Sequence, residues 1–227
     1  MNAGVTAPLL WCWRHPRAIG AEGRCIGHTD LAVDPRKARR LAHRIRDTAC
    51  RHGLPREVWV SPLMRSREVG RVLRRWGFVV HVDARLMELN FGPWDGQPWS
   101  AIAWSEVEAW QADLLHHVPG GGGHGSQDGQ RDQGSQRSQR SQRGQVGQGE
   151  SLAQLAARVQ AFVQAFVQET EAVAAPRLLV THGGWLNALG LLSRLSPRLL
   201  QPLVALAATD WPAPPRHGDL RTWPNSA

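Results

Sequence analysis

The chain alternates between short apolar runs and longer segments whose apolar residues recur at helical spacing. The short runs are cut off at once by proline, serine or glycine, a pattern typical of buried β-strands. They cover residues 9–13, 58–60, 78–82 and 178–181, with a closing edge strand within 218–223. The helical segments cover residues 35–52, 66–76, 99–117, 151–174, 185–194 and 197–206. This alternation predicts an α/β three-layer sandwich, with a largely parallel central sheet and helices on both faces.

Residues 120–149 interrupt the pattern. This segment is rich in glycine, serine, glutamine and arginine, and it repeats a Ser-Gln-Arg unit over 135–143. It has almost no apolar side chains, so it cannot bury enough surface to fold by itself. We expect a disordered insertion within one domain that spans residues 1–227, and an RNA-binding role for its arginines is the alternative.

The composition limits the classes of partner. The 227 residues carry a formal charge of +8, which indicates either solvated helix faces or attraction of small anionic substrates. No stripe of basic residues interleaved with aromatic residues occurs, so we expect no nucleic acid partner. The sequence contains neither a signal peptide nor an apolar run long enough to span a membrane, which predicts a cytoplasmic protein without membrane contact. Three scattered cysteines indicate neither a disulfide framework nor a zinc site, and the oligomeric state stays open.

Cationic side chains follow three of the predicted strands. Arg14 and His15 come directly after the first strand, Arg65 follows the strand at 58–60, and His182 follows the strand at 178–181. The carboxyl ends of parallel strands meet at one edge of a sheet, where α/β proteins bind ligands. Two guanidinium groups and two imidazoles at one edge predict a site for a compact anion, most simply phosphate.

The same residues can supply phosphoryl-transfer chemistry. No Walker-type phosphate loop and no cluster of carboxylates is present, so a nucleophile must come from the pocket itself. A histidine nitrogen can attack phosphorus, and His15 and His182 are both candidates. Glu88, among apolar neighbours, is either the proton donor to the leaving group or a salt-bridged loop carboxylate.

Five motifs in order resemble the histidine phosphatase superfamily, whose fold is also called phosphoglycerate mutase-like. The resemblance implies that His15 is the phosphorylated nucleophile and that Arg14, Arg65 and His182 form the phosphate pocket. It also implies that Glu88 donates a proton to the leaving group and later activates water, with no cofactor or metal. The motifs are Arg14-His15, residues 61–67 (SPLMRSR), residues 88–96 (ELNFGPWDG), residues 149–151 (GES) and residues 181–184 (THGG).

One loop points to a substrate. The superfamily typically has glycine and an acidic residue after Arg-His, whereas this chain has Pro16 and Arg17, and proline cannot donate a backbone hydrogen bond there. The following segment, residues 23–31, resembles that of the α-ribazole-5′-phosphate phosphatases of cobalamin biosynthesis, which also tolerate Arg-His-Pro. This resemblance implies α-ribazole 5′-phosphate or adenosylcobalamin 5′-phosphate as substrate. It makes four further residues candidates for substrate binding: Arg24, Cys25, Ile26 and Gly27. Gly183 is a fifth candidate, because it lies at the start of the helix after the strand at 178–181, where free backbone N–H groups favour an anion.

Two other interpretations remain open. A broad-specificity sugar-phosphate or nucleotide phosphatase, or a phosphoglycerate mutase-like enzyme, would use the same pocket. Its tryptophans, Trp11, Trp13, Trp94 and Trp99, could stack on a base, although Trp11 and Trp13 lie within an apolar strand and favour the core. An inactive phosphate-binding regulatory protein is the non-enzymatic alternative.

Overall fold

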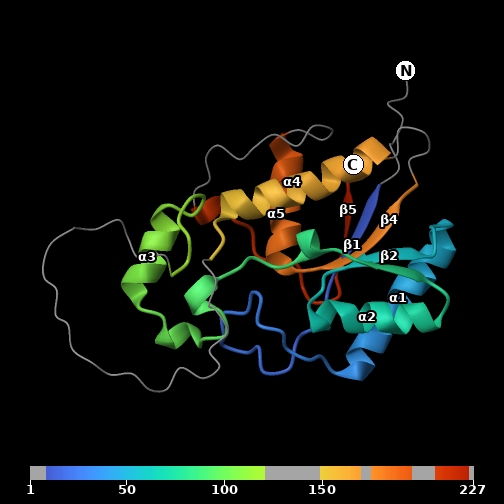
Figure 1. The fold of residues 1–227 in the computed structure, drawn as a ribbon, viewed down its shortest axis with the longest axis horizontal. Coiled ribbons are helices and arrows are strands. Elements are labelled where there is room, and N and C mark those ends of the chain that lie inside the picture. Colours follow the sequence, from blue (N-terminus) through green and yellow to red (C-terminus); the bar gives the residue numbers. More distant parts are fainter. Residues whose placement is uncertain (1–8, 121–148, 170–174, 196–207, 225–227) are drawn as a thin grey trace, which may run out of the picture.

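The computed structural model describes residues 9–120, 149–169, 175–195 and 208–224 (Figure 1). Five strands form one sheet: β1 (Leu10–Arg14), β2 (Glu57–Val60), β3 (Val79–Val82), β4 (Arg177–Thr181) and β5 (Leu220–Trp223). Five α-helices accompany them among these residues: α1 (Pro35–His52), α2 (Met64–Arg75), α3 (Trp104–Ala112), α4 (Leu152–Glu169) and α5 (Gly183–Leu195). Short 3₁₀ turns lie at Ala84–Leu86, Gly92–Trp94, Trp99–Ala101 and Ala208–Asp210.

The sheet has the order β3-β2-β4-β1-β5, and only β5 runs antiparallel to its neighbour. In the parallel register, Arg14 of β1 pairs with Thr181 of β4, and Val60 of β2 pairs with Val180. The last residues of β1, β4 and β2 therefore lie side by side, as the prediction of a common carboxyl edge requires. The predicted α/β sandwich and the edge strand near the C-terminus are confirmed.

Helices cover both faces of the sheet, with α4 and α5 on one face and α1 and α2 on the other (Figure 1). Strand β1 shows why, since successive side chains of a strand point to opposite faces. Leu10 and Cys12 belong to the core under α4 and α5, whereas Trp11 and Trp13 belong to the core under α1 and α2. Each face therefore has its own apolar layer, which leaves the strand ends as the place for a polar site.

The predicted helix over 99–117 is wrong as a single element. The chain instead forms a 3₁₀ turn at Trp99–Ala101, a short α3, and turns beyond Ala112. The apolar residues of this segment pack into two different cores, because Ile102 joins Cys25 and Trp94 whereas Leu114 joins the core under α4 and α5. Trp110 of α3 packs against both cores, and the chain turns on either side of α3 to bring Ile102 and Leu114 to their separate cores. The predicted helix over 197–206 and residues 170–174 lie outside the described residues.

The chain comes close together on the two sides of the segment 121–148. A methyl group on Gly149 would stand 2.7 Å from the Pro119 carbonyl oxygen, and one on Gly120 would stand 2.6 Å from the Pro93 ring. The chain therefore leaves and rejoins the described part at one point. None of the helices in the described part is both long and apolar enough to span a bilayer.

Candidate active site

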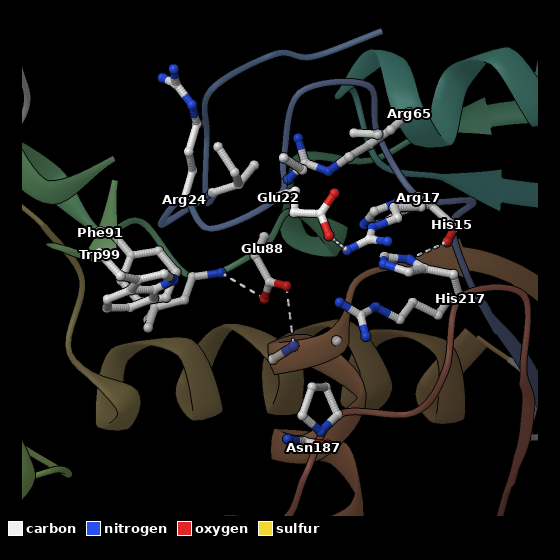
Figure 2. Close-up of a pocket in the computed structure, with 18 of the residues that line it drawn as sticks. His15, Arg17, Glu22, Arg24, Arg65, Glu88, Phe91, Trp99, Asn187 and His217 are labelled. Atoms are coloured by element: carbon white, nitrogen blue, oxygen red, sulfur yellow. Dashed lines mark hydrogen bonds and ion pairs between the residues drawn. The ribbon is translucent and has the colours of Figure 1, made fainter. Parts of the chain in front are cut away.

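A cleft of about 380 Å³ opens at the carboxyl edge of the sheet. It receives Arg14 and His15 from the end of β1, Arg65 from the first turn of α2, and Glu88 from the segment after β3 (Figure 2). The start of α5 adds Gly183 and Gly184. Four groups that are far apart in the sequence are thus brought into one cavity by the parallel register.

His15 has one defined tautomer. Its Nδ1 lies 2.6 Å from the Pro16 carbonyl oxygen, and a carbonyl can only accept, so Nδ1 carries the hydrogen and Nε2 carries the lone pair. Its backbone N–H donates to Thr181, which ties the residue to the end of β4. Burial, with Arg65 as the next cause, lowers the pKa of His15 well below its usual value. The imidazole is therefore neutral, as a nucleophile must be.

Two guanidinium groups face the cleft beside His15. Arg14 donates from Nη1 to the Pro215 carbonyl at 2.6 Å. Arg65 is almost fully buried and donates to the carbonyls of Thr29 and Gly27 at 2.9 and 2.5 Å. Within the described part, no protein acceptor reaches Nε of either arginine. Backbone carbonyl groups thus orient the guanidinium groups of Arg14 and Arg65 and leave N–H donors of both for an anion.

Asp95 holds the loop that positions Arg65. Its carboxylate accepts the backbone N–H groups of Gly27, His28 and Thr29 and, at 2.6 Å, the Thr29 hydroxyl. Gly27 lies so close to the next segment that a Cβ would stand 2.2 Å from the Leu89 carbonyl oxygen. Only glycine fits there, and the Gly27 carbonyl contributes to the site by orienting Arg65.

Glu88 lies on the floor of the cleft and is 9% exposed. Its two carboxylate oxygens accept from the N–H groups of Leu89 (3.0 Å) and Gly184 (3.2 Å). Its carbonyl lies 2.9 Å from His28 Nε2 and accepts from Arg158, whose guanidinium also pairs with Glu150 at 2.7 Å. The segment around Glu88 is therefore anchored on both sides, and the carboxylate is available to a bound ligand.

His182 lies behind His15 and is fully buried, with the two ring centroids 4.8 Å apart. Burial and the neighbouring cations lower the pKa of His182. Among the residues described, no group hydrogen-bonds to either of its ring nitrogens. A buried imidazole with both nitrogens unpartnered is costly unless a ligand uses it. His182 is not among the residues that line the cleft, so its place in a phosphate pocket stays a prediction.

The remaining predicted residues divide into two groups. Arg24, Ile26 and Gly183 line the cleft. Cys25 does not, because its side chain is fully buried with Trp94 and Ile102, and burial raises the pKa of the thiol. Gly27 also lies outside the lining. Of the tryptophans named above, only Trp99 reaches the cleft, and the other three are buried in the cores.

Several cleft residues were not predicted as site residues. Phe91 and Trp99 lie on one side of Glu88, and His15 and His217 lie on the other (Figure 2). His217 belongs to the proline-rich tail, and nothing in the local sequence marks it as functional. The other unpredicted lining residues include Arg17, Glu22, Trp110, Asn187 and Trp211.

The chain belongs to the histidine phosphatase superfamily, branch 1, whose sequence model matches residues 10–131 and 124–201. Among solved structures, a complex of mycobacterial glucosyl-3-phosphoglycerate phosphatase Rv2419c with VO3 has a TM-score of 0.65 at 22% identity, covering 97% of this chain and 100% of that one. TTHB049 from Thermus thermophilus has a TM-score of 0.56 at 23% identity, covering 96% and 95%. No curated protein matches the chain. These likenesses establish the fold, and the superfamily match supports phosphatase activity.

Proposed function

We propose that this protein is a phosphomonoesterase that works without a metal, through a phosphohistidine at His15. The observation that carries the proposal is the fixed tautomer of His15, whose free Nε2 faces a cleft shared with two oriented guanidinium groups and a carboxylate. These groups supply what phosphoryl transfer requires: a nucleophile, neutralisation of the phosphoryl charge, and a proton for the leaving oxygen.

The first step forms the phosphoenzyme. The Nε2 lone pair of His15 attacks phosphorus while the bond to the ester oxygen breaks, and protonated Glu88 gives its proton to that oxygen. Arg14, Arg65 and His182 hold the three non-bridging oxygens. The backbone carbonyl of Pro16 stabilises the positive charge that develops on the ring, because it accepts from Nδ1–H.

The second step releases phosphate. The Glu88 carboxylate takes a proton from a water molecule, the hydroxide oxygen bonds to phosphorus, and the P–N bond breaks. The electron pair of that bond returns to Nε2, and His15 is neutral again. Glu88 ends the cycle protonated, ready for the next ester.

Two variants test this mechanism. His15→Ala should lower kcat by about a thousandfold or more and should abolish the acid-labile, base-stable phosphoenzyme seen after rapid mixing with labelled substrate. Glu88→Gln should lower kcat/KM, which reports formation of the phosphoenzyme, far more for esters with poor leaving groups than for p-nitrophenyl phosphate, since p-nitrophenolate leaves without a proton. Undiminished turnover by His15→Ala would exclude the proposed nucleophile.

We further propose α-ribazole 5′-phosphate, or the 5′-phosphate of adenosylcobalamin, as the substrate in cobalamin biosynthesis. The resemblance of residues 23–31 supports this, together with an aromatic wall across the cleft from His15. Phe91 and Trp99 meet edge to face with ring centroids 6.1 Å apart, and Trp99 is 41% exposed. An exposed indole beside a phosphate pocket suits an ester that carries a flat aromatic ring.

Glucosyl-3-phosphoglycerate is a second candidate substrate. Arg17 and Arg24 line the same cleft, and their guanidinium groups could hold a carboxylate. Solved phosphatases named for that substrate share the fold.

Steady-state rates without added metal on α-ribazole 5′-phosphate, glucosyl-3-phosphoglycerate, 3-phosphoglycerate and p-nitrophenyl phosphate separate the candidates. A marked preference in kcat/KM for the ribazole ester is expected. Trp99→Ala should then reduce that preference while leaving p-nitrophenyl phosphate almost unaffected. Equal rates on all four would indicate a broad-specificity phosphatase.

A further inference from the structure

The C-terminal segment lies directly on the nucleophile. Four hydrogen bonds join it to Arg14 and His15. They run from Arg14 Nη1 to Pro215 O (2.6 Å), from Arg14 N to Asp219 O (3.1 Å), from Gly218 N to Arg14 O (2.9 Å) and from His217 Nδ1 to His15 O (3.0 Å). Strand β5 continues from this segment and pairs with β1. The segment is therefore a wall of the cleft held in register with His15.

His217 is the one side chain of this segment, within the described residues, that reaches the cleft with a titratable group. Its ring centroid lies 5.3 Å from that of His15, and both rings appear on the same side of Glu88 (Figure 2). Because Nδ1 must donate to the His15 carbonyl, the hydrogen is on Nδ1, and Nε2 is the nitrogen left for a ligand.

A proline occupies the position after the nucleophile. Pro16 has no backbone N–H, so the turn after His15 lacks a donor that another residue would bring to a phosphate there. A donor from elsewhere in the chain can take that place. His217 lines the cleft together with His15 and lines a neighbouring cavity together with Pro16, so it stands between the two.

We propose that His217 is a phosphate-binding residue of this site, which takes up a proton from solvent together with the anion and donates from Nε2–H to a phosphoryl oxygen. The inference rests on the proposed function, since it assumes that the cleft beside His15 holds a phosphoryl group.

The charges around His217 explain why proton uptake follows the anion. Burial and the nearby guanidinium groups lower the pKa of His217 to about 4, so the free enzyme holds it neutral. A bound dianion opposes that positive field and favours the imidazolium. The charged or titratable groups that face it are Arg14, His15, Arg17 and Arg65 around the cleft, together with the carboxylates Glu22 and Glu88 of the same cleft. Beyond the cleft lie Lys37, Arg40 and Arg44 of α1, and Arg216 and Asp219 belong to its own segment.

Two substitutions distinguish phosphate binding by His217 from a structural role, in which His217 only tethers the C-terminal segment to the His15 carbonyl. Asparagine places an amide near the position of Nδ1, so His217→Asn keeps the bond to the His15 carbonyl and loses the group at Nε2. Glutamine places its amide near Nε2, so His217→Gln keeps a donor for phosphate and loses the tether. His116→Asn is the matched control, because His116 is exposed and lies outside the cleft.

The measurement is the dissociation constant of inorganic phosphate, by calorimetry, from pH 5.5 to 8. His217→Asn should weaken binding by about tenfold, the factor expected for one charge-assisted hydrogen bond, while His217→Gln stays within about threefold of the wild type. The ratio of wild-type to His217→Gln affinity should rise toward low pH. His217 must take up a proton to bind the anion, so low pH favours the wild type, whereas glutamine donates at every pH. The titration of phosphate itself cancels in that ratio.

Three outcomes would overturn the proposal: asparagine retaining the affinity while glutamine loses it, neither variant changing it, or a ratio that does not depend on pH. Phosphate binding is read without turnover. A failure of this proposal can therefore be told from a failure of the proposed function. The proposed function fails if the His15→Ala variant still forms the phosphoenzyme.

Discussion

His15, His182 and His217 lie where protonation is unfavourable. For all three, burial is the main cause of a lowered pKa, and neighbouring arginines add to it. A histidine with a lowered pKa in the folded state binds fewer protons than in the unfolded state once the pH falls below about 6.5. The site therefore keeps a neutral nucleophile in mildly acidic solution at a cost in stability.

This gives a prediction for stability against pH. Stability is complete above about pH 6.5 and is lost as the pH falls toward 4, the folded-state pKa of His217. Replacing His217 by asparagine should make the decline in Tm between pH 7.5 and 4.5 shallower, whereas His116→Asn should leave its slope unchanged. Equal slopes for wild type and His217→Asn would contradict the lowered pKa.

At the scale of the element, helix α5 positions the acid of the site. Gly183 and Gly184 open the helix, and the Gly184 N–H donates to the Glu88 carboxylate. A Cβ on Gly184 would stand 2.4 Å from Glu88 Oε1. The start of α5 and Glu88 are therefore in contact without room for a methyl group.

Gly184→Ala should accordingly lower kcat/KM by about tenfold or more and leave Tm within a few degrees. The new methyl group displaces the carboxylate at the end of the flexible Glu88 side chain, so the substitution moves the acid and leaves the packing of the core unchanged. Alanine also favours the helix, which supports an unchanged stability. Gly190→Ala in the same helix is the control, because nothing lies within 4 Å of its Cβ and its activity should stay normal. Normal activity in both variants would show that the position of Glu88 is not critical.

The region of α3 shows that apolar residues at helical spacing do not always form one helix. Ile102, Val107, Trp110 and Leu114 follow helical spacing, yet α3 covers only Trp104–Ala112 and has no fully buried residue. Ile102 and Leu114 pack in different cores. The spacing of apolar residues indicates that they are buried, but it does not indicate in which core each of them packs.

At the scale of the whole molecule, the inserted segment is separable from the site. Gly149 lies beside Pro119, so the chain comes close together on the two sides of 121–148, and a closed loop costs little extra entropy as it lengthens. Deleting residues 121–148 and joining Gly120 to Gly149 should keep kcat/KM within about twofold and Tm within a few degrees. A large loss of either, measured on p-nitrophenyl phosphate and by thermal melting, would show that the segment contributes to the folded domain.

Local sequence features predicted the sheet, most of the helices and the residues that follow the strand ends. Strand-like runs, their terminators and the polar residues that follow them are local features, and in a parallel sheet the strand ends must meet. The strand-end argument therefore predicted Arg14, His15, Arg65 and His182. Glu88 follows no strand end directly, and its prediction rested on its apolar neighbours and on the resemblance to the superfamily. Their roles in catalysis remain predictions for the variants above to test.

The rest of the cleft depends on contacts between distant segments of the chain. Cys25 was expected near the substrate and lies instead in a small core, whereas His217 comes to the cleft from about 200 residues away through the pairing of β5 with β1. Contacts of this kind depend on strand register and on competition among apolar residues for a place in each core. Neither is encoded in the residues next to Cys25 or His217, because both are set by segments far away in the chain.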